Sequence, residues 1–270
     1  EEHLRRVEAA IGTIETSKLE KVVLARAVDI EFPEVIDPRL VAARLIDLSA
    51  NRDGFIADLS PAGRPGAMLV GSSPEVLIKR QGSTVSAFPL AGSSPRRATP
   101  AEDHIAGQDL LHSAKDLHEH AFVVEHLRRV LKPLCERLNI PDTPQLISTN
   151  EMWHLGTPVT GTLKDKHLTA LELALATHPT PAICGTPAEA AQALIETAET
   201  DRGFYAGAVG WCDSSGDGEY IVAIRCAEVA GDGLSARAWA GGGIVGDSNA
   251  QAELEETTAK LQTILRALSL

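Results

Sequence analysis

Strand-like and helix-like segments are segregated along this 270-residue chain rather than alternating, and this order limits the folds open to it. Helical periodicity over residues 4–14 leads into strand-like residues from Lys21 onward. The longest periodic stretch, residues 101–138, predicts a single long helix. Segregated strands and helices predict an α+β fold with antiparallel sheets and outer helices.

The remaining elements follow from turn residues and caps. Asp37 and Pro38 predict the cap and first position of a second helix. Three short strands separated by turns predict an antiparallel meander, and two more helices and three more strands follow. The meander covers 66–70, 74–79 and 83–88; the helices cover 188–197 and 251–268; the later strands cover 204–212, 219–230 and 234–240.

The predicted strand 219–230 is apolar on both faces, yet Arg225 lies in its middle. Burying an unpaired charge costs several kcal/mol or more, so a guanidinium in a sheet core needs an anionic partner. We therefore expect Arg225 to bind an anion.

Composition narrows the function classes. A formal net charge of −12 argues against a broad nucleic-acid interface, which needs clustered Lys and Arg. The four cysteines show no paired spacing, which favours a reduced cytoplasmic setting. No apolar run approaches the roughly 18 residues of a membrane span, so no membrane association is expected.

Acidic pairs one helical turn apart occur on two predicted helices. Asp116 and Glu119 share one face, and Glu253, Glu256 and Lys260 share another. Carboxylates from two helices could together hold a divalent cation such as Mg²⁺. A solvated helix face is the more common explanation for any one such pair, and both interpretations stay open.

Three further features could carry chemistry. The three consecutive glycines in residues 239–248 could cradle an anion with backbone N–H groups or could form a tight turn. Lys21 begins an apolar strand, where burial would favour a neutral amine and general base, and Glu75 could be a buried acid. Exposed positions at strand ends are the alternative for both. His154 lies in a segment predicted to be an ordered loop, without a second His at metal-ligand spacing.

The order of these motifs resembles that of the chorismate-utilising enzymes, and most closely the isochorismate synthases of siderophore pathways. The resemblance rests on collinear segments between Lys21 and Leu268: KVVLAR, GSSPE, FPLAGS, KDLHEH, MWHLGTP, HPTPAICGTP, FYAGAVGWCD, IRCAEV, AGGGIV and ELEETTAK. It implies a single catalytic domain over 1–270, two packed antiparallel sheets with outer helices, and Mg²⁺-dependent isomerisation of chorismate.

The resemblance also implies roles for individual residues. Lys21 would activate water for attack at C2, and Glu75 would protonate the departing 4-hydroxyl group. Glu119 and Glu256 would hold Mg²⁺, with Glu253 close by. The implied substrate-binding residues are Arg225, Gly92, Ser93, His154, Ala182, Ile183, Tyr205, Gly241, Gly243 and Lys260. Chorismate is a dicarboxylate, so Arg225 would bind one carboxylate and the metal the other.

Several alternatives remain open within the family. Tyr205 is typical of salicylate-forming relatives, so pyruvate lyase activity is an alternative, and a chorismate-binding remnant without turnover is another. Both siderophore and menaquinone pathways begin with isochorismate. Lys21 favours water as nucleophile, so we expect no glutamine amidotransferase partner, and we expect a monomer. Relatives carry a further N-terminal segment, and without it we expect an exposed sheet edge or apolar patch.

Overall fold

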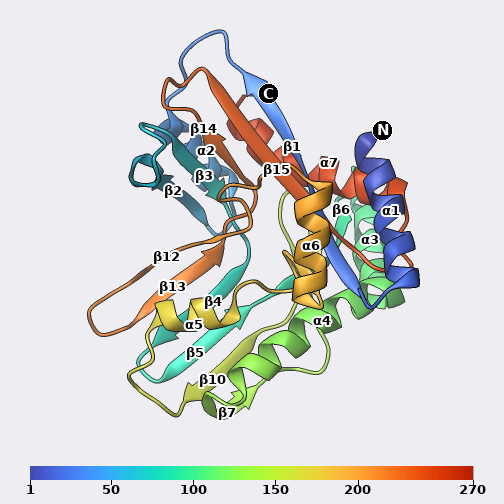
Figure 1. Cartoon of the computed structure of the whole chain (residues 1–270), viewed down its shortest axis with the longest axis vertical. Coiled ribbons are helices and arrows are strands. Elements are labelled where there is room, and N and C mark those ends of the chain that lie inside the picture. Colours follow the sequence, from blue (N-terminus) through green and yellow to red (C-terminus); the bar gives the residue numbers. More distant parts are fainter. Residues whose placement is uncertain (270) are drawn as a thin grey trace.

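Two six-stranded sheets and one three-stranded sheet, all antiparallel, form the framework of the computed structural model, which describes residues 1–269 (Figure 1). The first sheet has the order β11 (Gly185–Thr186), β1 (Lys21–Glu31), β15 (Ser235–Ile244), β14 (Cys226–Val229), β3 (Met68–Ser72), β2 (Gly54–Asp58). The second has the order β12 (Ala208–Cys212), β13 (Gly218–Val222), β4 (Val76–Gln81), β5 (Thr84–Phe88), β10 (Val159–Leu163), β7 (Cys135–Asn139). The third has the order β6 (Leu90–Pro95), β9 (Met152–Gly156), β8 (Gln145–Ser148). The predicted α+β class with antiparallel sheets is confirmed, and the small third sheet is an addition to it.

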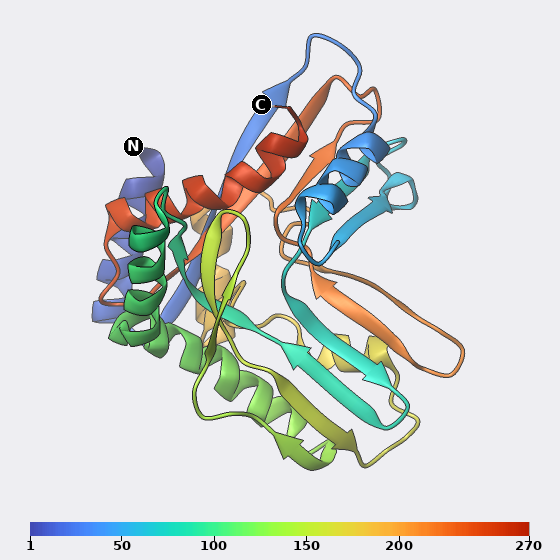
Figure 2. The ribbon, with the colours of Figure 1, turned by 180° about the vertical axis from the view of Figure 1, so that it is seen from behind.

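Helices cover the outer faces of these sheets. They are α1 (Glu2–Thr16), α2 (Pro38–Leu48), α3 (Pro100–His112), α4 (Ala114–Leu131), α5 (Ala170–Thr177), α6 (Ala188–Ala198) and α7 (Ala250–Ala267), with a short 3₁₀ turn at Ser60–Ala62. Figure 2 shows α7 lying across the rear of the first sheet. There Leu261 and Ile264 join a buried apolar cluster with Leu45 of α2 and Val70 of β3. The predictions for α1, α2, α6 and α7 are confirmed, including Asp37 as the cap of α2.

The main hydrophobic core lies between the two large sheets. It contains Leu69 of the first sheet, Ile78 and Val85 of the second, and Leu127 and Leu131 of α4. Apolar side chains from both sheets thus leave water together, and burial of this kind is the main favourable term in folding.

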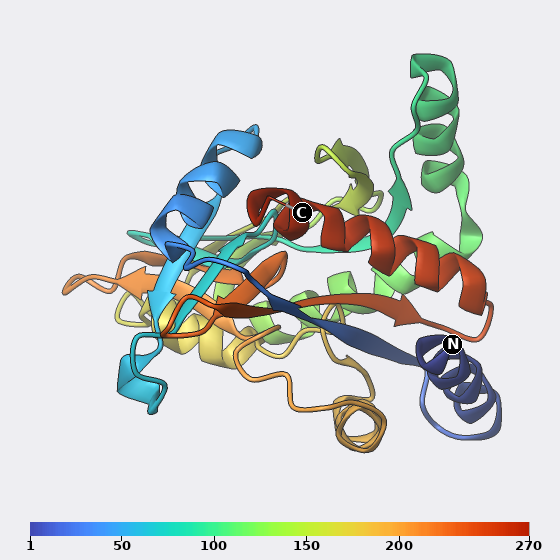
Figure 3. The same ribbon diagram turned by 90° about the horizontal axis from the view of Figure 1, so that it is seen from above.

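The prediction of one long helix over 101–138 is wrong. Ser113 ends α3 and caps α4, since its side chain accepts a hydrogen bond from the Asp116 N–H. The two helices point in different directions in Figure 3, and α3 packs on the third sheet, where Trp153 of β9 donates to the Asp103 carbonyl at 3.1 Å. Helix α4 ends at Leu131, shortly before Pro133, which cannot continue a helix. The apolar residues of α3 and α4 keep a helical spacing across the bend between the two helices. Only the capping residue Ser113 marks the bend in the sequence.

The three-stranded meander is also wrong, because β3 and β4 belong to different sheets. Residues 73–75 cross from the first sheet to the second. The predicted strand 219–230 divides in the same way: β13 pairs in the second sheet and β14 in the first. The break falls at Arg225, whose φ of 51° is unusual for a residue other than glycine.

These two crossings lie against each other. The Ser72 N–H donates to the Arg225 carbonyl at 3.1 Å, and the Val222 N–H donates to the Glu75 carbonyl at 3.1 Å. Glu75 and Arg225, separated by 150 residues in sequence, therefore meet where the chain passes twice between the sheets.

Two local predictions need correction. Gly241, Gly242 and Gly243 do not form a turn; they lie inside β15, paired with Ala25, Leu24 and Val23 of β1. Binding of an anion by their backbone N–H groups stays a prediction. His154 lies in β9 rather than in a loop.

The outer strands of the large sheets, β2 and β12, flank a groove of about 890 Å³. Ile56 and Trp211 line it and are 42% and 59% exposed. That this surface promotes association stays a prediction.

None of the four cysteines forms a disulfide. Among residues 1–269, no helix is both long and apolar enough to cross a membrane.

Candidate active site

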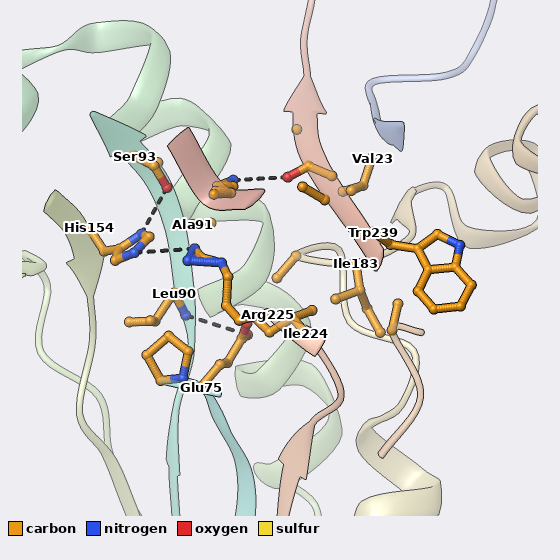
Figure 4. Close-up of a pocket in the computed structure, with 18 of the residues that line it drawn as sticks. Val23, Glu75, Leu90, Ala91, Ser93, His154, Ile183, Ile224, Arg225 and Trp239 are labelled. Atoms are coloured by element: carbon orange, nitrogen blue, oxygen red, sulfur yellow. Dashed lines mark hydrogen bonds between the residues drawn. The ribbon is translucent and has the colours of Figure 1, made fainter. Parts of the chain in front are cut away.

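A buried cavity lies beside the two crossings, and most of the predicted site residues line it (Figure 4). Those on its wall are Glu75, Gly92, Ser93, Glu119, His154, Ala182, Ile183, Tyr205, Arg225, Gly241, Gly243 and Lys260. Lys21 and Glu256 do not line it but are ion-paired with Glu119 and Lys260 of its wall, and Glu253 is ion-paired with Lys115. The cavity measures about 50 Å³, so side chains on its wall must rotate outward to admit a ring compound.

Arg225 is held by a short relay of side chains. Its Nη2 lies 3.4 Å from His154 Nε2, and His154 Nδ1 lies 2.9 Å from Ser93 Oγ. A guanidinium only donates, so Nε2 must be the unprotonated nitrogen and Nδ1–H donates to Ser93. Burial and the charges of Arg225 and Lys260 hold the pKa of His154 well below its usual value, which agrees with a neutral ring.

No carboxylate within residues 1–269 forms an ion pair with Arg225. The side chain is only 5% exposed, and its Nη1 is buried without a hydrogen-bond partner. The anion expected from the sequence is thus not supplied by the protein. A buried, unpaired guanidinium on a cavity wall favours an anionic ligand there.

Glu75 is 3% exposed, and its Oε1 accepts one long hydrogen bond from the Leu90 N–H, at 3.5 Å. Burial raises the pKa of Glu75 to about 7, although this hydrogen bond and the charges of Lys21 and Arg225 act in the opposite direction. A carboxyl group with this pKa is protonated in an appreciable fraction near neutral pH and can donate a proton.

Three acids and three lysines pair on the other side of the cavity. Lys21 Nζ lies 3.1 Å from Glu119, Lys115 Nζ lies 2.8 Å from Glu253, and Lys260 pairs with Glu256. All three glutamates are buried, so the solvated-face interpretation of these helices is wrong for them. Burial alone would raise the pKa of Glu119, but Lys21, Lys115 and Lys260 lower it.

The glycines of β15 let α4 and α7 bring these acids close to the sheet. A Cβ at Gly243 would stand 2.0 Å from Glu119 Oε1 and 3.0 Å from Lys21 Cε. A Cβ at Gly242 would stand 3.0 Å from Glu253 Oε2. The glycines are therefore needed for close approach of carboxylates rather than for a special backbone conformation.

The donor set suits a hard cation that completes its shell with other ligands. Within residues 1–269, no three acidic, His or Cys side chains are grouped as a complete metal site. Carboxylates from two helices nevertheless converge on one strand, and Glu253 Oε2 is buried without a hydrogen-bond partner. Burial and the neighbouring Glu256 raise the pKa of Glu253. Mg²⁺ is commonly held by one or two carboxylates together with water and substrate oxygens, and these residues fit that pattern.

The site contains other residues that were not predicted from the sequence. Lys115 lies four residues before Glu119, and that helical spacing could have identified it. Pro74, Leu90, Ile224 and Trp239 also line the cavity. None was predicted as a site residue, although Pro74, Leu90 and Ile224 lie inside the motifs GSSPE, FPLAGS and IRCAEV.

Comparison with known proteins assigns the class. The profile of the chorismate binding enzyme family matches residues 1–269, and the chain belongs to this family. The chain is 51% identical over 252 residues to a Mycobacterium tuberculosis protein named MenF, covering 93% of this chain and 68% of that protein. It is 45% identical over 271 residues to the isochorismate synthase DhbC of Bacillus subtilis, covering 99% and 68%. The crystal structure of DhbC from Bacillus anthracis superimposes with a TM-score of 0.94 at 42% identity, covering 100% of this chain and 72% of that one.

Proposed function

We propose that this chain is a single catalytic domain that converts chorismate to isochorismate with Mg²⁺. The observation that carries the proposal is that a buried lysine and a buried carboxylic acid both lie at one cavity. Lys21 is fully buried, and Glu75 has a pKa raised to about 7. The name of the related DhbC of Bacillus subtilis supports the same reaction.

The reaction requires addition of water at C2 and loss of the 4-hydroxyl group, with no net oxidation. In the proposed mechanism, Lys21 accepts a proton from the attacking water and Glu75 donates a proton to the departing hydroxyl group. A lysine must be neutral to act as a base, so the ion pair of Lys21 with Glu119 must break first. A hydroxyl group is thereby added at C2 while the protonated 4-hydroxyl group leaves as water. No covalent enzyme intermediate is needed.

The two carboxylates of chorismate match the two charged features of the cavity. Arg225, oriented by His154 and Ser93, would bind one carboxylate. Glu119 and Glu256 would hold Mg²⁺, and Glu253 would lie next to it; the bound metal would neutralise the second carboxylate. The amine of Lys260, on the cavity wall, pairs with Glu256 and donates to the Gly241 carbonyl at 3.0 Å. Local cations thereby offset the acidic net charge of the chain.

The direct test is to incubate the protein with chorismate and Mg²⁺, with and without EDTA, and to follow products by proton NMR. Isochorismate formed only with free Mg²⁺ supports the proposal. If chorismate raises the melting temperature but no product forms, the chain is a binding remnant.

A second candidate is salicylate synthesis, in which isochorismate then loses pyruvate. The observation favouring it is the hydroxyl of Tyr205 in the cavity wall, 2.9 Å from the position that a Gly241 Cβ would take. Release of pyruvate, measured by coupling to lactate dehydrogenase, decides between the two activities. The four free cysteines support a reducing, cytoplasmic setting for either one.

A further inference from the structure

One wall of the cavity is tied together by a buried ion pair that does not itself line the cavity. Within residues 1–269, strand β1 pairs with another strand on its outer edge only at Lys21 and Val22, which pair with β11. The backbone groups of Val23 and Ala25 on this edge are bound by other means. The Val23 N–H donates to the Cys184 carbonyl at 2.8 Å, and the Ala25 N–H donates to Glu199 Oε1 at 2.7 Å.

Arg202 completes this edge. Its Nε and Nη2 donate to the two carboxylate oxygens of Glu199, each at 2.7 Å. Nη2 also donates to the Val23 carbonyl at 2.7 Å, and Nη1 donates to the Ile183 carbonyl at 2.8 Å. The side chains of Arg202 and Glu199 are only 15% and 4% exposed. A planar guanidinium is the one side chain that can bind a carboxylate and two carbonyls in fixed directions at once.

The groups that Arg202 contacts belong to one side of the cavity. Val23 and Ile183 line it, and the guanidinium carbon lies 5.9 Å from the centre of the Tyr205 ring. Tyr205 in turn stacks on Trp239, with ring centres 5.9 Å apart. Figure 4 shows Val23, Ile183 and Trp239 together on the side opposite Ser93, His154 and Glu75. Arg202 thus joins β1, the loop containing Ile183 and the turn containing Tyr205.

We infer that Arg202, held by Glu199, is a positioning residue that fixes this wall and so sets the affinity for the ring substrate. The inference rests on the proposed function, since it assigns Arg202 to chorismate binding. Side chains of the wall can rotate to admit the ring while their backbone stays anchored to Arg202. A wall that contacts substrate and transition state alike contributes uniform binding, so its loosening raises KM and leaves kcat nearly unchanged.

The test compares Arg202→Lys with a matched control, Arg80→Lys. Arg80 is also buried and also binds one carboxylate and two carbonyls, those of Asp217, Ser215 and Lys166, but none of these three partners lines the cavity. Lysine keeps the charge and loses the forked geometry. We expect both variants to melt at lower temperature than the wild type. Only Arg202→Lys should raise the KM for chorismate, by about tenfold, with kcat within about threefold.

Two further measurements keep the inference separate from the proposed function. The first is the Kd for chorismate by calorimetry, which reports on the wall even if the wild type binds without turnover. The second is amide hydrogen exchange without ligand, in which residues 182–186 and 203–207 should exchange about tenfold faster in Arg202→Lys than in Arg80→Lys. If KM, Kd and exchange in these segments change no more in Arg202→Lys than in the control, Arg202 is merely structural and the inference is wrong. A wild type that forms no isochorismate refutes the proposed function alone.

Discussion

Replacing Glu75 by glutamine should stabilise the protein at alkaline pH while abolishing turnover. Burial raises the pKa of Glu75 from 4.5 to about 7. Between these values the folded chain holds a proton that the unfolded chain has released. Stability is therefore lost as pH rises through this window, and the loss is complete above about pH 7. A difference of about 2.5 pKa units corresponds to about 3 kcal/mol.

The Glu75→Gln variant has no charge to bury at this position, so it escapes this cost. Urea denaturation should show the variant under about 1 kcal/mol more stable than the wild type at pH 5 and about 3 kcal/mol more stable at pH 8.5. Glu8→Gln, on the exposed face of α1, serves as the control and should follow the wild type at both pH values. If the stability difference between Glu75→Gln and wild type is the same at pH 5 and pH 8.5, the pKa of Glu75 is not raised in the folded state and the reasoning is refuted.

Three other perturbations test the site and one tests the fold. Lys21→Met should lower kcat by about 10²–10⁴-fold while calorimetry shows that chorismate still binds. The control Lys18→Met, at an exposed position, should leave kcat unchanged. An equal kcat in both variants would show that Lys21 is not the base. Glu256→Gln should raise the Mg²⁺ concentration for half-maximal thermal stabilisation by about tenfold or more, whereas its exposed neighbour variant Glu255→Gln should leave it unchanged; an unshifted titration would reject the ligand assignment. Turnover should fall as pH rises above about 7, because Glu75 then loses the proton it must donate; a rate that keeps rising to pH 9 would contradict its role. Ser113→Ala should cost about 1 kcal/mol in urea denaturation by removing the cap of α4, and an unchanged midpoint would mean that the cap contributes nothing.

The sequence by itself predicted several of the local elements and the candidate residues of the site. Helix α2 follows from Asp37 and Pro38, and α7 follows from its apolar period, because capping and periodicity are local properties. Arg225 was chosen as a charge within an apolar strand, and the roles of Lys21 and Glu75 came from the collinear motifs; the structure places all three at one cavity or directly beside it.

The tertiary structure decided which segments meet, because that depends on hydrogen bonds between residues far apart in the chain. No local signal showed that residues 73–75 and 223–225 would cross between sheets side by side, since each segment looks like an ordinary strand. Nor did composition show that the glycines of β15 make room for Glu119 and Glu253, because their need for close approach appears only when two helices pack on the strand. Periodicity measures which face of an element is apolar; contacts between distant elements decide which buried charges share a cavity.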